Sequence, residues 1–161
     1  MRGGWLSTGD LGLVDEAGHL VISGRKKELI VTSYGKNVTP AKVEERLRSV
    51  PGVREAMLVG DGEAYCVALL WTDDPVVDER RARAIDDAVE AQNALLSHPE
   101  RAKAWLVLPY DLSIERGDLT ANLKLRRREV LGRRAAAVSA LYGRGPLPPG
   151  ACHLGRAERE S

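Results

Sequence analysis

The sequence has little cysteine and no long apolar run. Its two cysteines, Cys66 and Cys152, lack partners at metal-ligand spacing, so the sequence predicts neither a disulfide framework nor a structural zinc site. No apolar stretch approaches the roughly 18 residues of a membrane span, and the first ten residues lack the apolar core of a signal peptide. We therefore expect no transmembrane segment and a cytoplasmic location.

An excess of charge of one sign is also missing. The 24 lysines and arginines nearly balance the 23 aspartates and glutamates, for a net charge of +1, which argues against a dedicated nucleic-acid-binding protein. The histidines His19, His98 and His153 form no readable catalytic or metal-binding pattern with serine, aspartate or cysteine. We therefore predict no metal site and no nucleic-acid partner.

What is present fits one compact domain. The 161 residues, 43% of them hydrophobic, are enough to bury a core without a metal or disulfide. Apolar alternation between turn residues predicts strands, and apolar residues at helical spacing predict helices. The predicted strands span 11–14, 19–23, 28–32, 53–59, 64–71 and 105–108, and the predicted helices span 40–50, 76–97 and 125–142.

This order of elements predicts an α+β fold, with an N-terminal β-hairpin followed by a short sheet packed with about three helices. The segment 64–71 is almost wholly apolar, so it is expected to be a central strand. Residues 143–161 begin with a glycine- and proline-rich stretch and end in polar residues, which predicts a disordered tail.

Two segments near the N-terminus place charged side chains at strand ends. Asp10 follows Thr8 and Gly9, and a carboxylate at such a turn can accept two hydrogen bonds from the neighbouring hydroxyls of a ribose; alternatively, it only caps the turn. The segment GRKKE at 24–28 favours either an arginine that reaches a nucleotide beside a flexible connection, or a solvated strand edge.

Two further segments precede helices. The loop YGKNVTP at 34–40 opens onto a helix N-terminus, which can meet an anion or the amide chain of a cofactor, or can be a simple helix start. Lys124 ends the segment LTANLK; it is either a surface lysine or a point charge placed against a phosphate. The following helix presents a solvated or anion-binding face of five arginines, Arg126, Arg127, Arg128, Arg133 and Arg134.

In their order and spacing, these segments resemble the C-terminal part of AMP-forming acyl-CoA synthetases. The matching motifs are GWLSTGDLG, GRKKELIVTSYGKNVTP and LTANLK. These enzymes belong to the adenylate-forming superfamily, which includes luciferases and the adenylation domains of peptide synthetases. The form GRKKE is most similar to the long-chain fatty acyl-CoA synthetase branch, and the likeness runs from about Gly4 to about Tyr142.

The resemblance implies a role for each matching residue. Asp10 and Arg25 match the residues that bind the ribose of ATP and of the acyl-adenylate, and Lys27 matches the hinge about which the C-terminal domain swings. Lys124 matches the catalytic lysine that contacts the α-phosphate during adenylation. The loop that approaches the pantetheine arm of CoA corresponds to Gly35, Lys36 and Asn37.

The same resemblance implies a division into three parts. Residues 1–26 are the end of the large domain, with the hinge-proximal hairpin, residues 27–142 are the C-terminal lid domain, and residues 143–161 are the tail. The superfamily's N-terminal domain, with its phosphate loop and acyl pocket, is not found in the 161 residues. We therefore expect little or no ligase activity from this chain alone, and fatty acid, ATP, CoA and Mg²⁺ as ligands of the complete enzyme only.

Two positions depart from the family pattern. Tyr34 and Leu123 stand where many relatives have glycine. A larger side chain at Tyr34 would narrow a pantetheine passage, which favours an alternative in which the ligase stops at the adenylate or loads an acyl carrier protein. A third reading is a non-catalytic, stand-alone binding or regulatory module. Acyl-chain length is not encoded here, because the resemblance places that pocket elsewhere.

Overall fold

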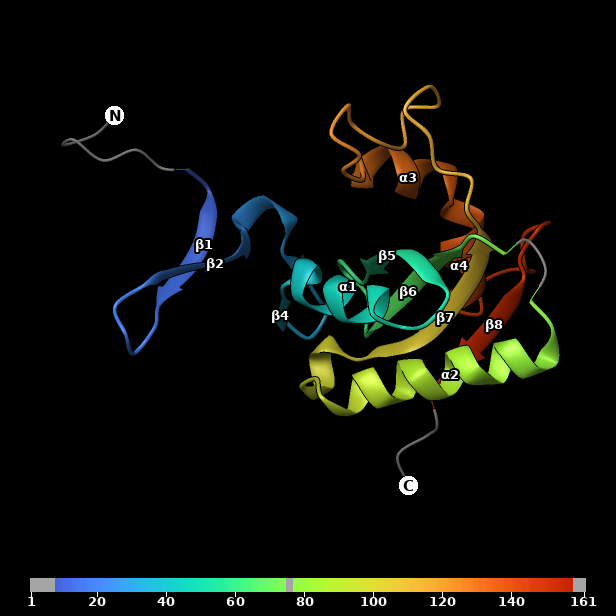
Figure 1. Cartoon of the computed structure of the whole chain (residues 1–161), viewed down its shortest axis with the longest axis horizontal. Coiled ribbons are helices and arrows are strands. Elements are labelled where there is room, and N and C mark those ends of the chain that lie inside the picture. Colours follow the sequence, from blue (N-terminus) through green and yellow to red (C-terminus); the bar gives the residue numbers. More distant parts are fainter. Residues whose placement is uncertain (1–7, 75–76, 158–161) are drawn as a thin grey trace.

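The computed structural model describes residues 8–74 and 77–157 (Figure 1). Residues 1–7 of the predicted hairpin segment, Val76 at the start of a predicted helix, and residues 158–161 of the predicted tail lie outside this description. The strands are β1 (Asp10–Val14), β2 (Leu20–Arg25), β3 (Ile30–Val31), β4 (Asn37–Val38), β5 (Val53–Val59), β6 (Cys66–Thr72), β7 (Ala102–Pro109) and β8 (His153–Arg156). The helices are α1 (Pro40–Arg48), α2 (Glu79–Ala94), α3 (Arg127–Arg133) and α4 (Ala135–Leu141), with 3-10 turns at Lys26–Glu28 and His98–Glu100.

This mixture of short helices and sheets confirms the predicted α+β class. The main sheet has the order β5-β6-β7-β8, in which β6 and β7 are parallel and the other neighbours are antiparallel. Every residue of β6 is buried, as the continuous apolar run predicts. Since parallel neighbours need a long crossover connection, α2 lies between β6 and β7 in the chain and crosses the sheet (Figure 1).

The two faces of the sheet carry separate cores. Successive side chains of a strand point to opposite faces, so Trp105 of β7 packs with α1 and α2, whereas its neighbour Leu106 packs with α3 and α4. Val43 and Leu47 of α1 are fully buried in the first core. Burying one such side chain contributes about 1.5–3 kcal/mol relative to leaving it exposed, so the sheet fixes both helix layers that approach the site.

The N-terminal hairpin lies beside the main sheet. Strands β1 and β2 pair antiparallel, and β2 contacts α1. Figure 1 shows the hairpin projecting from the body of the domain, joined to it by the turn Lys26–Glu28. Gly24 permits the close approach, because a Cβ atom there would lie 2.8 Å from Cγ2 of Thr39. The hairpin end that holds Asp10 and Arg25 is thereby brought close to the start of α1.

The C-terminal segment differs from the predicted disordered tail. Residues His153–Arg156 form β8, which pairs with β7 and adds a strand to the sheet. His153 Nε2 lies 2.9 Å from both carboxylate oxygens of Asp86, whose Oδ1 also accepts a hydrogen bond of 2.7 Å from Trp105 Nε1. The prediction is therefore wrong for these residues. Backbone pairing with the edge of β7 and side-chain docking outweigh a composition that by itself favours disorder.

The predicted helix 125–142 is also different in the structure. Helix α3 starts only at Arg127, and the chain leaves helical geometry at Arg134, where φ is −100° and ψ is 18°. The guanidinium of Arg134 contacts the carboxylate of Asp111. A long-range ion pair is thus made at the break in a segment whose local pattern favours one continuous helix.

Candidate functional site

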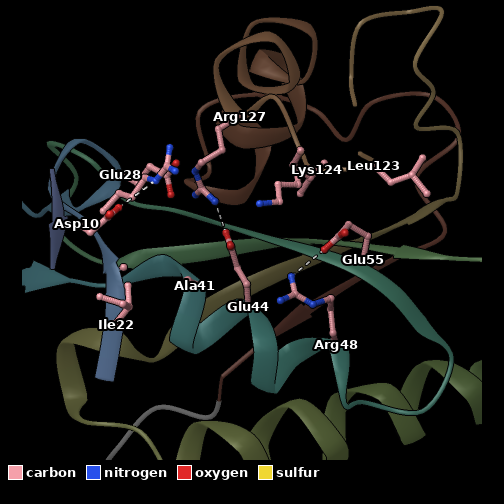
Figure 2. Close-up of a pocket in the computed structure, with 13 residues that line it drawn as sticks. Asp10, Ile22, Glu28, Ala41, Glu44, Arg48, Glu55, Leu123, Lys124 and Arg127 are labelled. Carbon is pink, nitrogen blue, oxygen red and sulfur yellow. Dashed lines mark hydrogen bonds and ion pairs between the residues drawn. The ribbon is translucent and has the colours of Figure 1, made fainter. Parts of the chain in front are cut away.

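Three of the residues singled out in the sequence lie around one open cleft. Asp10 and Arg25 come from the hairpin, and Lys124 comes from a turn almost a hundred residues further along the chain (Figure 2). The cleft has a volume of about 610 Å³. Its other charged walls come from α1, β5, α3 and the turn before β3, through Glu28, Glu44, Arg48, Glu55 and Arg127.

Asp10 and Arg25 are direct partners across the hairpin. They pair in register between β1 and β2, and Arg25 Nε lies 3.3 Å from Asp10 Oδ1. About a third of the Asp10 side chain and two thirds of the Arg25 side chain remain exposed. The carboxylate can therefore still accept hydrogen bonds from a ligand in the cleft, while the guanidinium can donate to the same ligand.

Lys124 stands in a tight turn and not in an open loop. The backbone N–H of Lys124 donates to Thr120 Oγ1 at 3.1 Å, and the N–H of Thr120 donates to the Lys124 carbonyl at 2.8 Å. Leu119 and Leu125 form an antiparallel bridge at the base of this turn. Leu123 has a φ of +58°, a conformation that glycine adopts with less strain. This geometry gives a physical reason for the glycine that the resemblance leads us to expect at this position.

A buried ion pair fixes the chain just after Lys124, and the sequence reasoning missed it. Glu44 of α1 is buried, and its Oε1 accepts a hydrogen bond of 2.7 Å from the Leu58 N–H of β5. Arg127, the first residue of α3, contacts both the Glu44 carboxylate and the Leu58 carbonyl. The only local sequence signal is a carboxylate between Val43 and Leu47 on the apolar face of α1. The pair ties α3 to the sheet and to α1.

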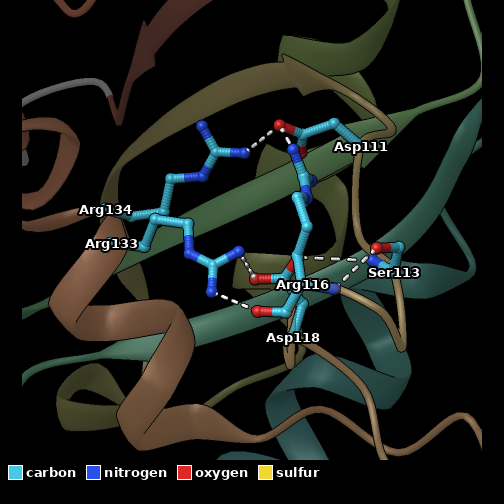
Figure 3. A network of polar contacts seen from close by, with 6 residues as sticks. All are labelled: Asp111, Ser113, Arg116, Asp118, Arg133 and Arg134. Carbon is cyan, nitrogen blue, oxygen red and sulfur yellow. Dashed lines mark hydrogen bonds and ion pairs between the residues drawn. The ribbon is translucent and has the colours of Figure 1, made fainter.

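A second polar network fixes the chain before Lys124 (Figure 3). Asp118 is buried, and its carboxylate lies 3.0 Å from Arg133 Nη1 and 3.3 Å from Arg116 Nε. It also accepts a hydrogen bond of 3.2 Å from the Ser113 N–H. The backbone carbonyl of Asp118 accepts from the Arg126 N–H at 2.8 Å. Both ends of the Lys124 turn are thus held by buried carboxylates.

Three of the five helix arginines therefore have specific partners. Arg127, Arg133 and Arg134 pair with Glu44, Asp118 and Asp111 respectively. The sequence predicts a solvated or anion-binding face for these three arginines, but in the structure their side chains pair with carboxylates of the same domain. Asp111 Oδ1 is buried and has no hydrogen-bond partner among the described residues.

The remaining singled-out residues lie outside the cleft. Lys27 belongs to the turn Lys26–Glu28 and lines a neighbouring hollow of about 400 Å³. Gly35 and Lys36 lie in a tight turn, where the Gly35 N–H donates to the Thr32 carbonyl at 2.8 Å, and Asn37 begins β4. Gly35 has a φ of +71°, which favours glycine there. The hinge candidate and the CoA-loop candidate are thus not among the residues that line the cleft of Asp10, Arg25 and Lys124, although the hollow beside Lys27 shares Glu28, Leu125 and Arg127 with that cleft.

Two further searches concern membranes and metals. Over residues 8–74 and 77–157, no helix combines the length and apolarity required to cross a bilayer. Within the same ranges, no group of three or more histidine, cysteine, aspartate or glutamate side chains could hold a metal ion.

Comparisons with known proteins agree on the kind of domain. The family model described as "AMP-binding enzyme C-terminal domain" matches residues 27–145. Long-chain-fatty-acid–CoA ligase FadD15 of Mycobacterium tuberculosis is 37% identical over 161 residues, which covers 88% of this chain and 27% of the ligase. Putative fatty-acid–CoA ligase fadD11 of the same species is 35% identical and covers 86% of this chain. The chain spans about a quarter of the length of these relatives.

Solved structures show the same fold. The A domain of carboxylic acid reductase from Segniliparus rugosus, in complex with AMP, superposes with a TM-score of 0.73 over 84% of this chain and 23% of that protein, at 23% identity. O-succinylbenzoate coenzyme A synthetase from Bacillus subtilis, also in complex with AMP, gives a TM-score of 0.59 over 80% of this chain and 24% of the synthetase, at 32% identity.

Proposed function

The chain belongs to the family of AMP-binding enzyme C-terminal domains, and on this premise we propose that it is the lid of an ATP-dependent, AMP-forming long-chain fatty acid–CoA ligase. The observation that carries the proposal is the cleft that gathers Asp10, Arg25 and Lys124 from distant parts of the sequence. The fatty-acid–CoA ligases among its relatives support the substrate class. The B. subtilis synthetase, solved with AMP and with ATP and magnesium, supports the nucleotide.

In this proposal, the two hairpin residues hold the ribose. The Asp10 carboxylate accepts hydrogen bonds from the two ribose hydroxyls, and the neighbouring Arg25 guanidinium orients that carboxylate. The contact of 3.3 Å between them leaves one carboxylate oxygen available for the ligand. The hairpin thereby fixes the nucleoside relative to Lys124.

Lys124 supplies positive charge during adenylation. The fatty acid carboxylate attacks the α-phosphorus of ATP, the bond to the β-phosphate breaks, and pyrophosphate leaves with the acyl-adenylate as product. Negative charge shifts onto the phosphate oxygens during this step, and an ammonium group held beside them stabilises the transition state. The turn built on Thr120, Glu44 and Asp118 holds the lysine backbone in place, which limits the reorganisation that the step needs.

The second half-reaction uses another part of the domain. The CoA thiolate attacks the acyl carbonyl, the thioester forms, and AMP leaves. We assign the approach of the pantetheine arm to the turn of Gly35, Lys36 and Asn37, and the hinge to Lys27. Because the structure separates this turn from Lys124, rotation of the domain about Lys27 can present the two in sequence.

The ligase chemistry also needs the rest of the relatives' length, which this chain does not match. Purified alone with ATP, Mg²⁺, a fatty acid and CoA, the chain is expected to form little or no acyl-CoA. Robust turnover by the lone chain would show that it carries a complete active site and would refute its role as a lid.

The role of Lys124 is tested in a completed enzyme, made by fusing the large domain of a ligase relative ahead of this chain. Lys124→Ala is expected to lower adenylation, measured by pyrophosphate release, by about 10²–10³-fold, as for loss of one transition-state donor. Thioester formation from pre-made acyl-adenylate should change little. Lys42→Ala, which removes an exposed lysine outside the cleft, is the matched control. Equal losses in both half-reactions would contradict the assigned role.

A further inference from the structure

Leu123, the residue before Lys124, combines two unfavourable features. Within residues 8–74 and 77–157, its φ of +58° is the only positive value at a residue other than glycine, and a residue with a Cβ atom is strained in this conformation. Leu123 is also apolar and 64% exposed. An exposed leucine alone is ordinary on a protein surface, but backbone strain gathers at functional sites. The two features together, at a cleft, indicate a residue with a functional role.

The turn holds Leu123 in this conformation. The Leu123 N–H donates to the Thr120 carbonyl at 2.9 Å, and the next N–H, that of Lys124, donates to Thr120 Oγ1 at 3.1 Å. The other leucines of the turn face the interior, since Leu119 is buried and Leu125 packs against the core that α3 and α4 cover. Leu123 belongs to neither core of the described residues. The turn thus orders an apolar side chain and leaves it uncovered.

The position of Leu123 follows the order of the groups in an acyl-adenylate. Leu123 lines the same cleft as Asp10 and Lys124. In Figure 2 the Lys124 side chain points toward the end of the cleft that holds Asp10, and the Leu123 side chain points the opposite way. In an acyl-adenylate, the phosphate lies between the ribose and the acyl carbonyl. With the ribose at Asp10 and the phosphate at Lys124, the carbons next to the carbonyl extend toward Leu123.

The surroundings of Leu123 in the cleft suit an apolar group. Arg48 of α1 and Glu55 of β5 also line the cleft, and they pair with each other at 3.0 Å. Glu55 Oε1 accepts a further hydrogen bond of 2.9 Å from the Ala56 N–H. A methylene group loses no hydrogen bond when it contacts Leu123, whereas a hydroxyl group there gives up its hydrogen bonds to water. The contact therefore favours an acid with unsubstituted carbons beside its carboxylate.

We propose that Leu123 is a specificity-determining residue for the acid, and that its side chain contacts the first methylene groups next to the carboxylate during adenylation. The inference rests on the proposed function, because it needs the ribose at Asp10 and the phosphate at Lys124. The selection acts on the polarity of the carbons at the reacting end and not on chain length. It gives a functional reason for a leucine in a turn where glycine would relieve the strain.

The experiment compares dodecanoic acid with 2-hydroxydodecanoic acid in the completed enzyme, by the kcat/KM of pyrophosphate release. The ratio between the two acids is measured in every variant, so that their intrinsic difference in reactivity cancels. Leu123→Asn keeps nearly the size of the side chain and tolerates a positive φ, but it removes the apolar contact. It should lower kcat/KM for dodecanoic acid about tenfold, and the preference over the hydroxy acid by about the same factor.

Further variants separate the contact from backbone strain and from general effects. Leu123→Gly, which relieves the strain, should lose the same preference, whereas Leu123→Met keeps an apolar side chain and should retain it. Leu95→Asn changes an equally exposed leucine at the end of α2, outside the cleft, and should leave both acids unaffected. In every Leu123 variant, the KM for ATP and thioester formation from pre-made dodecanoyl-adenylate should stay within about twofold, because the contact is made only during adenylation.

An unchanged preference in Leu123→Asn or in Leu123→Gly would overturn the proposal. An equal loss for both acids would also overturn it, since Leu123 would then contact the enzyme and not the acid. Lys124→Ala in the same fusion separates this inference from the proposed function. If Lys124→Ala lowers adenylation alone while the preference of the Leu123 variants stays unchanged, only the role of Leu123 is refuted. If Lys124→Ala lowers both half-reactions equally, the proposed function fails and this inference falls with it.

Discussion

Replacing Glu44 by glutamine tests whether the buried ion pair beneath the Lys124 turn stabilises the domain. The substitution keeps the size of the side chain and one oxygen that can accept from the Leu58 N–H. It removes the negative charge that faces Arg127. The exchange therefore isolates the charge interaction from packing.

The magnitude follows from the burial of the two partners. Breaking a fully buried ion pair costs about 3–5 kcal/mol, because it leaves one charge uncompensated. The Arg127 side chain is 23% exposed and keeps its contact with the Leu58 carbonyl, so we discount the cost to about 2 kcal/mol. For a domain of this size, that corresponds to a fall in Tm of about 4–8 °C. Glu44→Ala also leaves the Leu58 N–H unsatisfied and should cost about 1–3 kcal/mol more.

The assay is urea unfolding of the chain, followed by tryptophan fluorescence and by circular dichroism. Glu45→Gln, which changes an exposed carboxylate one residue away on the same helix, is the control and should change stability by less than about 0.5 kcal/mol. A Glu44→Gln variant as stable as the control would refute the reasoning that this pair holds α3 against α1 and β5.

Three further predictions concern pH, thiol chemistry and backbone strain. A hydrogen bond from Arg144 lowers the pKa of Glu63. Burial raises the pKa of Glu100, but hydrogen bonds from Lys42 and Ser97 outweigh the burial, so the net shift of the Glu100 pKa is also downward. The stabilisation of the folded state by these two carboxylates is therefore complete above their ordinary pKa of 4.5 and is lost as the pH falls through the lowered pKa values. The urea concentration at the midpoint of unfolding should drop between pH 5 and pH 3, and a midpoint that does not change with pH would contradict this reasoning. Burial raises the pKa of the Cys66 thiol to about 11, so at pH 8 a disulfide reagent should label Cys152 first and reach Cys66 only on unfolding; rapid labelling of both thiols in the native protein would contradict the burial. Leu123→Gly should leave stability unchanged or raise it by up to about 1 kcal/mol, because relief of the strained φ offsets the greater freedom of glycine in the unfolded chain; a clear loss in urea unfolding would contradict the strain.

Local patterns predicted those elements whose signals lie within a few residues. Thr39 and Pro40 mark the start of α1 in both sequence and structure, and the wholly apolar run that becomes β6 is buried as expected. The grouping of Asp10, Arg25 and Lys124 was a different kind of prediction, since it came from resemblance to a family. The structure places these residues around one cleft, but their roles stay predictions.

Long-range polar contacts were not predictable in the same way. Glu44 and Arg127 are 83 residues apart, and neither side chain carries a local sign of its partner. Arg134 interrupts a stretch whose alanines favour a continuous helix, at the place where its guanidinium meets Asp111. In both cases tertiary contacts decide the structure, and local propensity is only a weak guide to them.

Strand β8 has a practical consequence for anyone who trims the protein to the family boundary at residue 145. Removing the following residues would uncover the backbone donors and acceptors of β7 that now pair with β8. A bare strand edge of this kind recruits other strands. Dimers or aggregates seen with such a shortened protein would then be a product of the trimming, and light scattering of the two lengths side by side would reveal it.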